Sequence, residues 1–218
     1  MVTTDDEDFA WQARSFRDHG YNVKERMNLL ALEQKLPYIH DVVGWNYRMT
    51  EMQSAIGIAE LDRMDNWNLP TRKRNAHIIM DAIKDLPQVK YLPIDTEERV
   101  NGWFTMAISL DIEKMNCTIQ EFVTAVCAEG AACWKVFWPQ GHTENAYKNH
   151  NAFGKSGFPF KSKEYADPAS VDYSKVEVPN ALWHEDNTFT CFAYPTFTKE
   201  DCQQIGNALV KVITALAR

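Results

Sequence analysis

In residues 87–218 the apolar positions alternate in some segments, as in β-strands, and recur every three to four residues in others, as in helices. Together these two patterns predict a compact α+β unit. Residues 102–111 alternate, so we expect a strand with one face toward a core. One face is expected to carry Phe104, Met106, Ile108 and Leu110, and the other Trp103, Thr105, Ala107 and Ser109. Further strands are predicted over 89–94, 132–138 and 188–192.

Two helices of the same unit are marked by polar caps. Thr118 and Glu121 fit a capping box, in which each side chain satisfies an N–H group of the first helical turn, and Gly130 is expected to end this helix. Thr198 caps the last helix. The inward positions are Ile119, Phe122, Val123, Val126 and Cys127 in the first helix, and Cys202, Ile205, Leu209, Val212 and Leu216 in the last. Residues 139–187 show no sustained period, which is typical of a functional loop rather than a connection.

The beginning of the chain predicts a short strand over 1–4 and a helix from Asp5 to about His19, ended by Gly20. One face of this helix carries Phe9, Ala13 and Phe16. Soluble proteins rarely leave such a face exposed, so we expect a sheet beneath it. Residues 21–49 are loop-like, with a short helical piece over 24–34.

A long helix follows, because Thr50 and Gln53 fit a second capping box. Its apolar stripe is Met52, Ala55, Ile56 and Ala59, widened by Ile58, Leu61 and Met64. So wide a stripe predicts a helix packed on more than one side. Pro70 is expected to bend or restart the helix before a second amphipathic stretch, with Ala76, Ile79, Met80 and Ile83 on one face.

Composition narrows the classes of partner. The 218 residues are 45% apolar with a formal net charge of −7, and the basic cluster at 71–75 is short, which argues against a nucleic-acid partner. Five cysteines at irregular spacings indicate no disulfide framework and no zinc site, and favour a reducing, cytoplasmic compartment. No apolar run approaches the ~20 residues of a membrane span.

The segment GWNYRM, residues 44–49, is the strongest candidate for chemistry. Asn46 has an amide that both donates and accepts, and Arg48 a planar fork suited to phosphate or carboxylate. Both immediately precede a helix N-terminus, which favours an anion. The alternative interpretation is structural: Asn46 stabilises the turn, and Arg48 bonds a neighbouring carboxylate or carbonyl group.

The segment FWPQGH, residues 137–142, is a second candidate, because it places His142 on a loop after a strand. His142 and His150 have no third ligand at a helical or hairpin spacing, so we expect no metal site. A nucleophile–base pair of Cys133 and His142 is a further alternative, weakened because Cys133 is expected inside the core.

These motifs resemble a known family. The segment GWNYRMTEMQSAIGIAELDRMDNW, residues 44–67, resembles the Gly-Tyr-Asn-Tyr-Arg-Met-Ser-Glu-x-Gln-Ala-Ala-x-Gly segment and following helix of the PLP-dependent sugar aminotransferases of the DegT/DnrJ/StrS family. Residues 1–20, the turn FWPQGH and the segment 192–209 resemble other parts of that family. Where the family usually has His-Tyr before the proline, this chain has Phe137 and Trp138, which bears on the acceptor substrate.

The resemblance implies an α/β fold of fold-type I: residues 1–66 as the end of the PLP-binding large domain with the long connecting helix, and 67–218 as the small C-terminal α+β domain. It implies that Asn46 and Arg48 bind pyridoxal 5'-phosphate (PLP), and that Tyr47 and His142 contact the substrate. It also implies that the Schiff-base lysine lies upstream of residue 1, so that no catalytic residue is assigned in this chain. Implied partners are a small-molecule sugar, an amino-acid donor, and either a second copy of the chain or an N-terminal half of the enzyme.

Two functions from different classes follow. One is the C-terminal portion of an aminotransferase that moves an amino group from glutamate or glutamine to a nucleotide-linked keto-sugar. The other is a non-catalytic α+β module for oligomerisation or regulation, derived from such an enzyme.

Overall fold

The computed structural model describes residues 2–23, 44–135, 140–150, 157–165, 167 and 170–218. The chain divides into two compact units, residues 1–62 and 63–218, and each is described by itself. The helical piece predicted over 24–34 and part of the FWPQGH segment lie outside the described residues.

The first unit contains helix α1 (Glu7–Arg17). Its N-cap is Asp6, whose carboxylate accepts a hydrogen bond from the Phe9 N–H group at 2.8 Å. At the other end, His19 and Gly20 have φ angles of 60° and 78°, a conformation that ends a helix. The predicted helix is therefore confirmed, with each end one or two residues shorter than expected.

Helix α3 (Glu51–Asp62) begins at the predicted capping box. The Thr50 N–H group donates to Gln53 Oε1 at 3.0 Å, and the Gln53 N–H group donates to Thr50 Oγ1 at 3.3 Å. This local prediction is confirmed, because the box depends only on residues three positions apart.

The strand predicted at the start of the chain is wrong within the described residues, and the apolar faces of the two helices are exposed in this unit. Residues 2–4 form no strand, and the chain's four-stranded sheet lies entirely in the second unit. The aromatic face of α1 and the stripe of α3 therefore stay open to solvent; the side chain of Met52 is 79% exposed, and α3 has no buried residue. Exposed large apolar side chains on the two helices are Phe9, Phe16, Met52, Ile56, Ile58 and Leu61.

The second unit begins with a π-helical turn, Met64–Asn68 (η1), followed by helix α4 (Leu69–Ile83). The Asn68 N–H group donates to the Arg63 carbonyl at 2.9 Å. This hydrogen bond joins residues five positions apart, as in a π-helix, rather than four. Pro70 lies in the first turn of α4, where its missing N–H group costs no intrahelical bond. The predicted interruption at Pro70 is confirmed.

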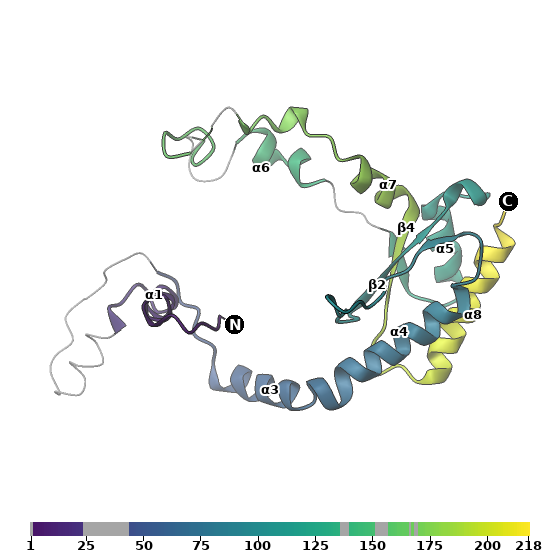
Figure 1. Cartoon of the computed structure of the whole chain (residues 1–218), viewed down its shortest axis with the longest axis horizontal. Coiled ribbons are helices and arrows are strands. Elements are labelled where there is room, and N and C mark those ends of the chain that lie inside the picture. Colours follow the sequence, from purple (N-terminus) through teal and green to yellow (C-terminus); the bar gives the residue numbers. More distant parts are fainter. Residues whose placement is uncertain (1, 24–43, 136–139, 151–156, 166, 168–169) are drawn as a thin grey trace. The chain divides into compact units, whose positions relative to one another are not determined.

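The sheet of the second unit has the order β1-β2-β4-β3, with every neighbouring pair antiparallel. Its strands are β1 (Val89–Tyr91), β2 (Thr105–Leu110), β3 (Cys133–Lys135) and β4 (Thr188–Phe192). Helices α4, α5 (Ile119–Ala128) and α8 (Lys199–Ala215) pack around a core that includes Ile79, Met106, Ile108, Phe122, Phe189 and Leu209 (Figure 1).

Phe104, Trp103 and Cys127 depart from the burial expected of them. Phe104 is 61% exposed and Trp103 is buried, because Trp103 has a φ of 50° and the strand's alternation begins only at Thr105. Cys127 is exposed, although the other predicted positions of α5 are buried and its capping box is present. Gly130, at φ 93°, follows the helix end as expected.

Residues 140–187 contain short elements that the sequence pattern did not show. They are η3 (Gly141–Thr143), α6 (Asn145–Lys148), η5 (Tyr173–Lys175) and the nine-residue helix α7 (Pro179–Asn187). Tyr147, His150, Phe160 and Tyr173 form a cluster of ring contacts between these elements. This segment therefore has structure of its own and lines the His142 cavity described below.

Asn75 joins α4 to the connection between β4 and α8. It is fully buried, and its amide donates to the carbonyl oxygens of Tyr194 at 2.7 Å and Phe197 at 3.1 Å.

Asn75→Ala would leave those two acceptors unsatisfied. We therefore expect the free energy of unfolding, measured by urea denaturation, to fall by ~1–3 kcal/mol. Asn207→Ala, at an exposed position of α8, should leave it unchanged or slightly raised. Equal effects of the two variants would contradict the role of Asn75.

Candidate functional site

The turn that carries Asn46 and Arg48 is held on the C-terminal end of α1 by the backbone. The Trp45 N–H group donates to the Phe16 carbonyl at 2.7 Å, and the Tyr47 N–H group donates to the Arg17 carbonyl at 2.9 Å. In return, the His19 N–H group donates to the Trp45 carbonyl at 3.0 Å. The helix end thereby satisfies its last carbonyl groups, and the turn acquires a fixed position relative to α1.

Gly44 is required by this close approach. A Cβ atom at residue 44 would lie 2.1 Å from the Gly20 nitrogen and 2.7 Å from the His19 carbonyl carbon. Both are backbone atoms, which cannot turn aside as a flexible side chain can. Only glycine lets the turn approach the end of α1 so closely.

Arg48 is oriented by two acceptors. Its Nε atom donates to Asn46 Oδ1 at 3.1 Å and lies 3.5 Å from Asp18 Oδ1. The structural alternative for Arg48 is therefore realised, since it does bond a carboxylate, but only through Nε. Asp18, which sequence reasoning missed, reaches this site because it lies at the end of α1, and no sequence spacing indicates that contact.

Several donors at this turn make no hydrogen bond in the described part of the chain. Within the described residues, Asn46 Nδ2, the two Nη atoms of Arg48 and the Glu51 and Met52 N–H groups at the start of α3 have no hydrogen-bond partner. Half of the Arg48 side chain is exposed. An amide, a guanidinium and a helix N-terminus close together in sequence fit an anion such as a phosphate group.

Tyr47 lies in the same turn and is 65% exposed. Its ring stacks on Trp45, with centroids 6.2 Å apart and ring planes 7° from parallel, and contacts Phe16 edge-on. The turn thus offers aromatic surface beside the free donors.

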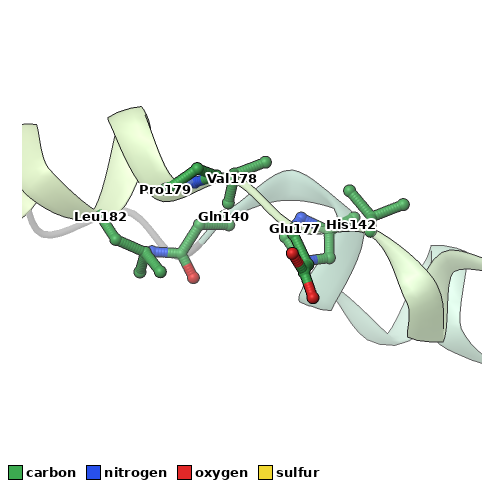
Figure 2. Close-up of a pocket in the computed structure, with 7 residues that line it drawn as sticks. Gln140, His142, Glu177, Val178, Pro179 and Leu182 are labelled. Carbon is green, nitrogen blue, oxygen red and sulfur yellow. The ribbon is translucent and has the colours of Figure 1, made fainter.

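His142 lies in the second unit, on η3, and lines a cavity of about 310 Å³. The other lining residues are Gln140, Val176, Glu177, Val178, Pro179 and Leu182. Figure 2 shows His142 and Glu177 toward one end and Gln140 and Leu182 toward the other. Gln140 Nε2 donates to Glu185 Oε2 at 2.5 Å, which joins η3 to α7. An imidazole, a carboxylate and an amide with apolar walls fit a small hydroxylated molecule.

The structure thus brings Asn46, Tyr47 and Arg48 together in one turn, and places His142 in the other unit. Glu177, Gln140 and α7 were not predicted as parts of a site, because they belong to a segment without a periodic pattern.

Cys133 is buried, as expected, and Cys191 pairs with it across β3 and β4. A hydrogen bond with Cys133 and burial both raise the pKa of the Cys191 thiol, so Cys191 is poorly suited to act as a nucleophile.

No cluster of three potential metal ligands occurs among the described residues, and His150 Nε2 lies 2.9 Å from the Val171 carbonyl oxygen. Among the residues that the structure describes, no helix is both long and apolar enough to cross a membrane.

A sequence profile of the DegT/DnrJ/EryC1/StrS aminotransferase family matches residues 1–171. The chain belongs to this family. Its aminotransferases depend on PLP, and the residues of the 44–48 turn fit the phosphate group of that cofactor.

Two relatives show how far the similarity extends. The spore coat polysaccharide biosynthesis protein SpsC of Bacillus subtilis is 22% identical over 213 residues, which are 98% of this chain and 49% of that protein. The GDP-perosamine synthase of Caulobacter vibrioides is 39% identical over 74 residues, which are 34% of this chain and 17% of that protein. The chain spans about half the length of the first of these.

Solved structures show the same fold. The aminotransferase from Psychrobacter cryohalolentis superposes with a TM-score of 0.69 at 19% identity, covering 98% of this chain and 51% of that one. A GDP-4-keto-6-deoxymannose-3-dehydratase with a trapped PLP-glutamate geminal diamine gives 0.62 at 19% identity, covering 95% and 49%.

The Gly44 contact generates a test. Gly44→Ala should displace the turn from α1, because the new methyl group would meet backbone atoms. We expect hydrogen exchange at the Trp45 and Tyr47 amides to become at least about tenfold faster, the effect of ~1.4 kcal/mol in local stability. Gly57→Ala is the control: the space around Gly57 is open, so the change should stabilise α3 and leave both amides protected. Unchanged protection in Gly44→Ala would contradict the argument.

Proposed function

We propose that the chain supplies part of the active site of a PLP-dependent aminotransferase that transfers an amino group from glutamate or glutamine to a nucleotide-linked keto-sugar. The family membership supports the reaction class. The relative named GDP-perosamine synthase and the solved dehydratase with its PLP-glutamate adduct support the sugar, the donor and the cofactor. The single observation that carries the proposal is the Asn46–Arg48 turn with its unengaged donors.

In this proposal Asn46 and Arg48 hold the cofactor phosphate. PLP, when bound, supplies the electron sink that the transfer of an amino group requires. Asn46 serves in two ways: its Oδ1 atom orients Arg48, and its NH₂ group donates to a phosphate oxygen. Asp18 lies near the same Nε atom of Arg48, so the guanidinium presents its Nη atoms without first having to be ordered.

Tyr47 and His142 are proposed to contact the substrate. The exposed ring of Tyr47 offers a flat surface beside the phosphate donors. The His142 cavity offers donors and acceptors that suit sugar hydroxyl groups, with Glu177 as a further acceptor. The lysine that PLP chemistry needs is proposed to come from outside residues 1–218, in a second subunit or an N-terminal half of the enzyme.

The open stripe of α3 supports such an assembly. Its exposed apolar side chains would be costly to leave in water, and burying one such side chain stabilises an interface by ~1.5–3 kcal/mol. We propose that this stripe, with the aromatic face of α1, packs against the companion subunit.

Two substitutions at Asn46 separate its structural role from its proposed role in binding. Asn46→Ala should weaken PLP binding in the assembled enzyme about 10- to 100-fold, the range for one hydrogen bond to a charged group. Asn46→Asp keeps the acceptor that orients Arg48 but puts a negative charge against the phosphate, so its loss should be larger still. The affinity is measured by equilibrium dialysis, with helix content checked by circular dichroism.

If Asn46 only stabilised the turn, Asn46→Asp would bind PLP as well as the unchanged protein does. That result would refute the phosphate role of Asn46.

Ala55 tests the assembly. Because it is exposed on α3, Ala55→Trp should change the chain's own unfolding free energy by less than ~0.5 kcal/mol. A bulky side chain in an interface should nevertheless weaken association, since overpacking costs ~1–3 kcal/mol. Sedimentation velocity would show a shift toward smaller species, which Ala55→Ser, of similar volume, should not cause. An unaltered oligomer in Ala55→Trp would show that this face is not an interface.

A further inference from the structure

Two buried free thiols lie opposite each other on neighbouring strands. Cys133 of β3 and Cys191 of β4 are direct partners in the antiparallel register. Opposite residues of an antiparallel pair have Cα atoms about 4.5 or 5.5 Å apart, and both spacings lie within the roughly 4.4–6.8 Å that a disulfide spans. The two thiols are already joined by a hydrogen bond. A covalent bond between them therefore needs no rearrangement of the strands.

The two strands differ in how easily they open. β3 has three residues and lies at the edge of the sheet, whereas β4 lies between β2 and β3. A short edge strand opens at a lower cost in free energy than a strand with neighbours on both sides. Opening of β3 exposes Cys133 to small solutes, while β4 keeps Cys191 in place. Cys133 is therefore the thiol that an oxidant reaches first.

The pair also closes a long segment of the chain, residues 134–190. This segment contains η3 with His142 and helix α7, which leads directly into β4. In the reduced protein, three residue pairs between β3 and β4 hold the two ends of the segment together. A covalent link at this point would restrict both ends at once, because a cross-link that closes a long loop removes much of the conformational freedom of the open states.

We propose that Cys133 and Cys191 form a reversible disulfide when the protein meets hydrogen peroxide, and that this bond fixes the two ends of the 134–190 segment. The proposal concerns the redox state of the sheet and goes beyond the proposed aminotransferase activity. Hydrogen peroxide is a fitting oxidant, because it is small and uncharged and can reach a thiol that a brief opening exposes.

The reaction has two steps. First, the Cys133 sulfur takes a hydroxyl group from the peroxide: the O–O bond breaks, an S–O bond forms, and one water leaves with the thiol proton. Second, the Cys191 sulfur attacks the resulting sulfenic acid: an S–S bond forms, the S–O bond breaks, and the hydroxyl group leaves with the Cys191 proton as a second water. The two thiols lose two electrons and the peroxide gains them. A thiol reductant restores both cysteines by exchange.

The rate of this reaction is set by the surroundings of Cys191. The hydrogen bond with Cys133 and burial raise the pKa of the Cys191 thiol, so its reactive thiolate is scarce at neutral pH. Oxidation is therefore slow in the closed sheet and depends on the opening of β3.

Cys127 is the competing partner, because it is exposed and close to β3. Its thiol donates to the Cys133 carbonyl oxygen at 3.2 Å, so it lies against the backbone of that residue. Cys191, in contrast, meets Cys133 thiol to thiol and in register. These contacts favour Cys191 as the partner of Cys133.

The test identifies the bond directly. The complete chain is reduced, treated with millimolar hydrogen peroxide and unfolded in the presence of N-ethylmaleimide, which blocks the remaining thiols. Mass spectrometry of the unreduced digest should then show a cross-linked pair of peptides that contain Cys133 and Cys191, and dithiothreitol should separate them. A cross-link from Cys127 to either residue, or oxidation of Cys133 without a cross-link, would overturn the proposal.

Hydrogen exchange tests the effect of the bond on the segment. The amides that join β3 to β4 should exchange at least about tenfold more slowly in the oxidised than in the reduced protein, because the link opposes separation of the strands. Equal exchange in the two forms would refute the restriction of the segment.

Variants complete the test. Cys191→Ala should abolish both the cross-link and the slower exchange. Cys127→Ser, at an exposed position beside the pair, is the matched control and should keep both. Loss of the cross-link in Cys127→Ser would contradict direct pairing of Cys133 with Cys191. Because neither PLP nor a sugar is present, failure of this proposal would leave the proposed function untouched.

Discussion

The candidate cofactor site depends on one close approach, that of the Gly44 backbone to His19 and Gly20. The left-handed backbone at the end of α1 leaves carbonyl groups that the 44–48 turn satisfies, and the missing side chain of Gly44 allows the contact. Through it, Asp18 at the end of one helix and Arg48 before the next come within reach of each other. The guanidinium is then oriented by the fold, so an anion that binds there need not order it first.

The second unit is organised around a different constraint, the position of α7. This helix ends the long segment 140–187 and leads directly into β4, and its residues Pro179 and Leu182 line the His142 cavity. The cavity of His142 and Glu177 suits hydroxyl groups. The antiparallel sheet and its three packed helices supply the rigid support that precise side-chain placement requires.

Local signals in the sequence predicted local structure well. The capping box of Thr118 and Glu121 and the interruption at Pro70 appear as expected, because each depends on residues within one helical turn. Contacts between distant segments could not be predicted. The partnership of Asp18 with Arg48 requires the fold itself, and the exposed stripe of α3 shows that an apolar pattern indicates burial without telling what covers it. The chemistry of its amide and the family resemblance both predict a role of Asn46 in binding PLP.

The most direct test of that role observes the turn while a phosphate-bearing cofactor is added. Pyridoxamine 5'-phosphate is suitable, because it lacks the aldehyde that would react with surface lysines. Backbone amide signals of residues 44–53 would be followed by NMR during titrations with this compound and with pyridoxamine, which has no phosphate. The account predicts saturable shifts at Asn46, Arg48 and the first amides of α3 with the phosphate compound alone. Identical responses to both compounds, or none in this segment, would contradict it.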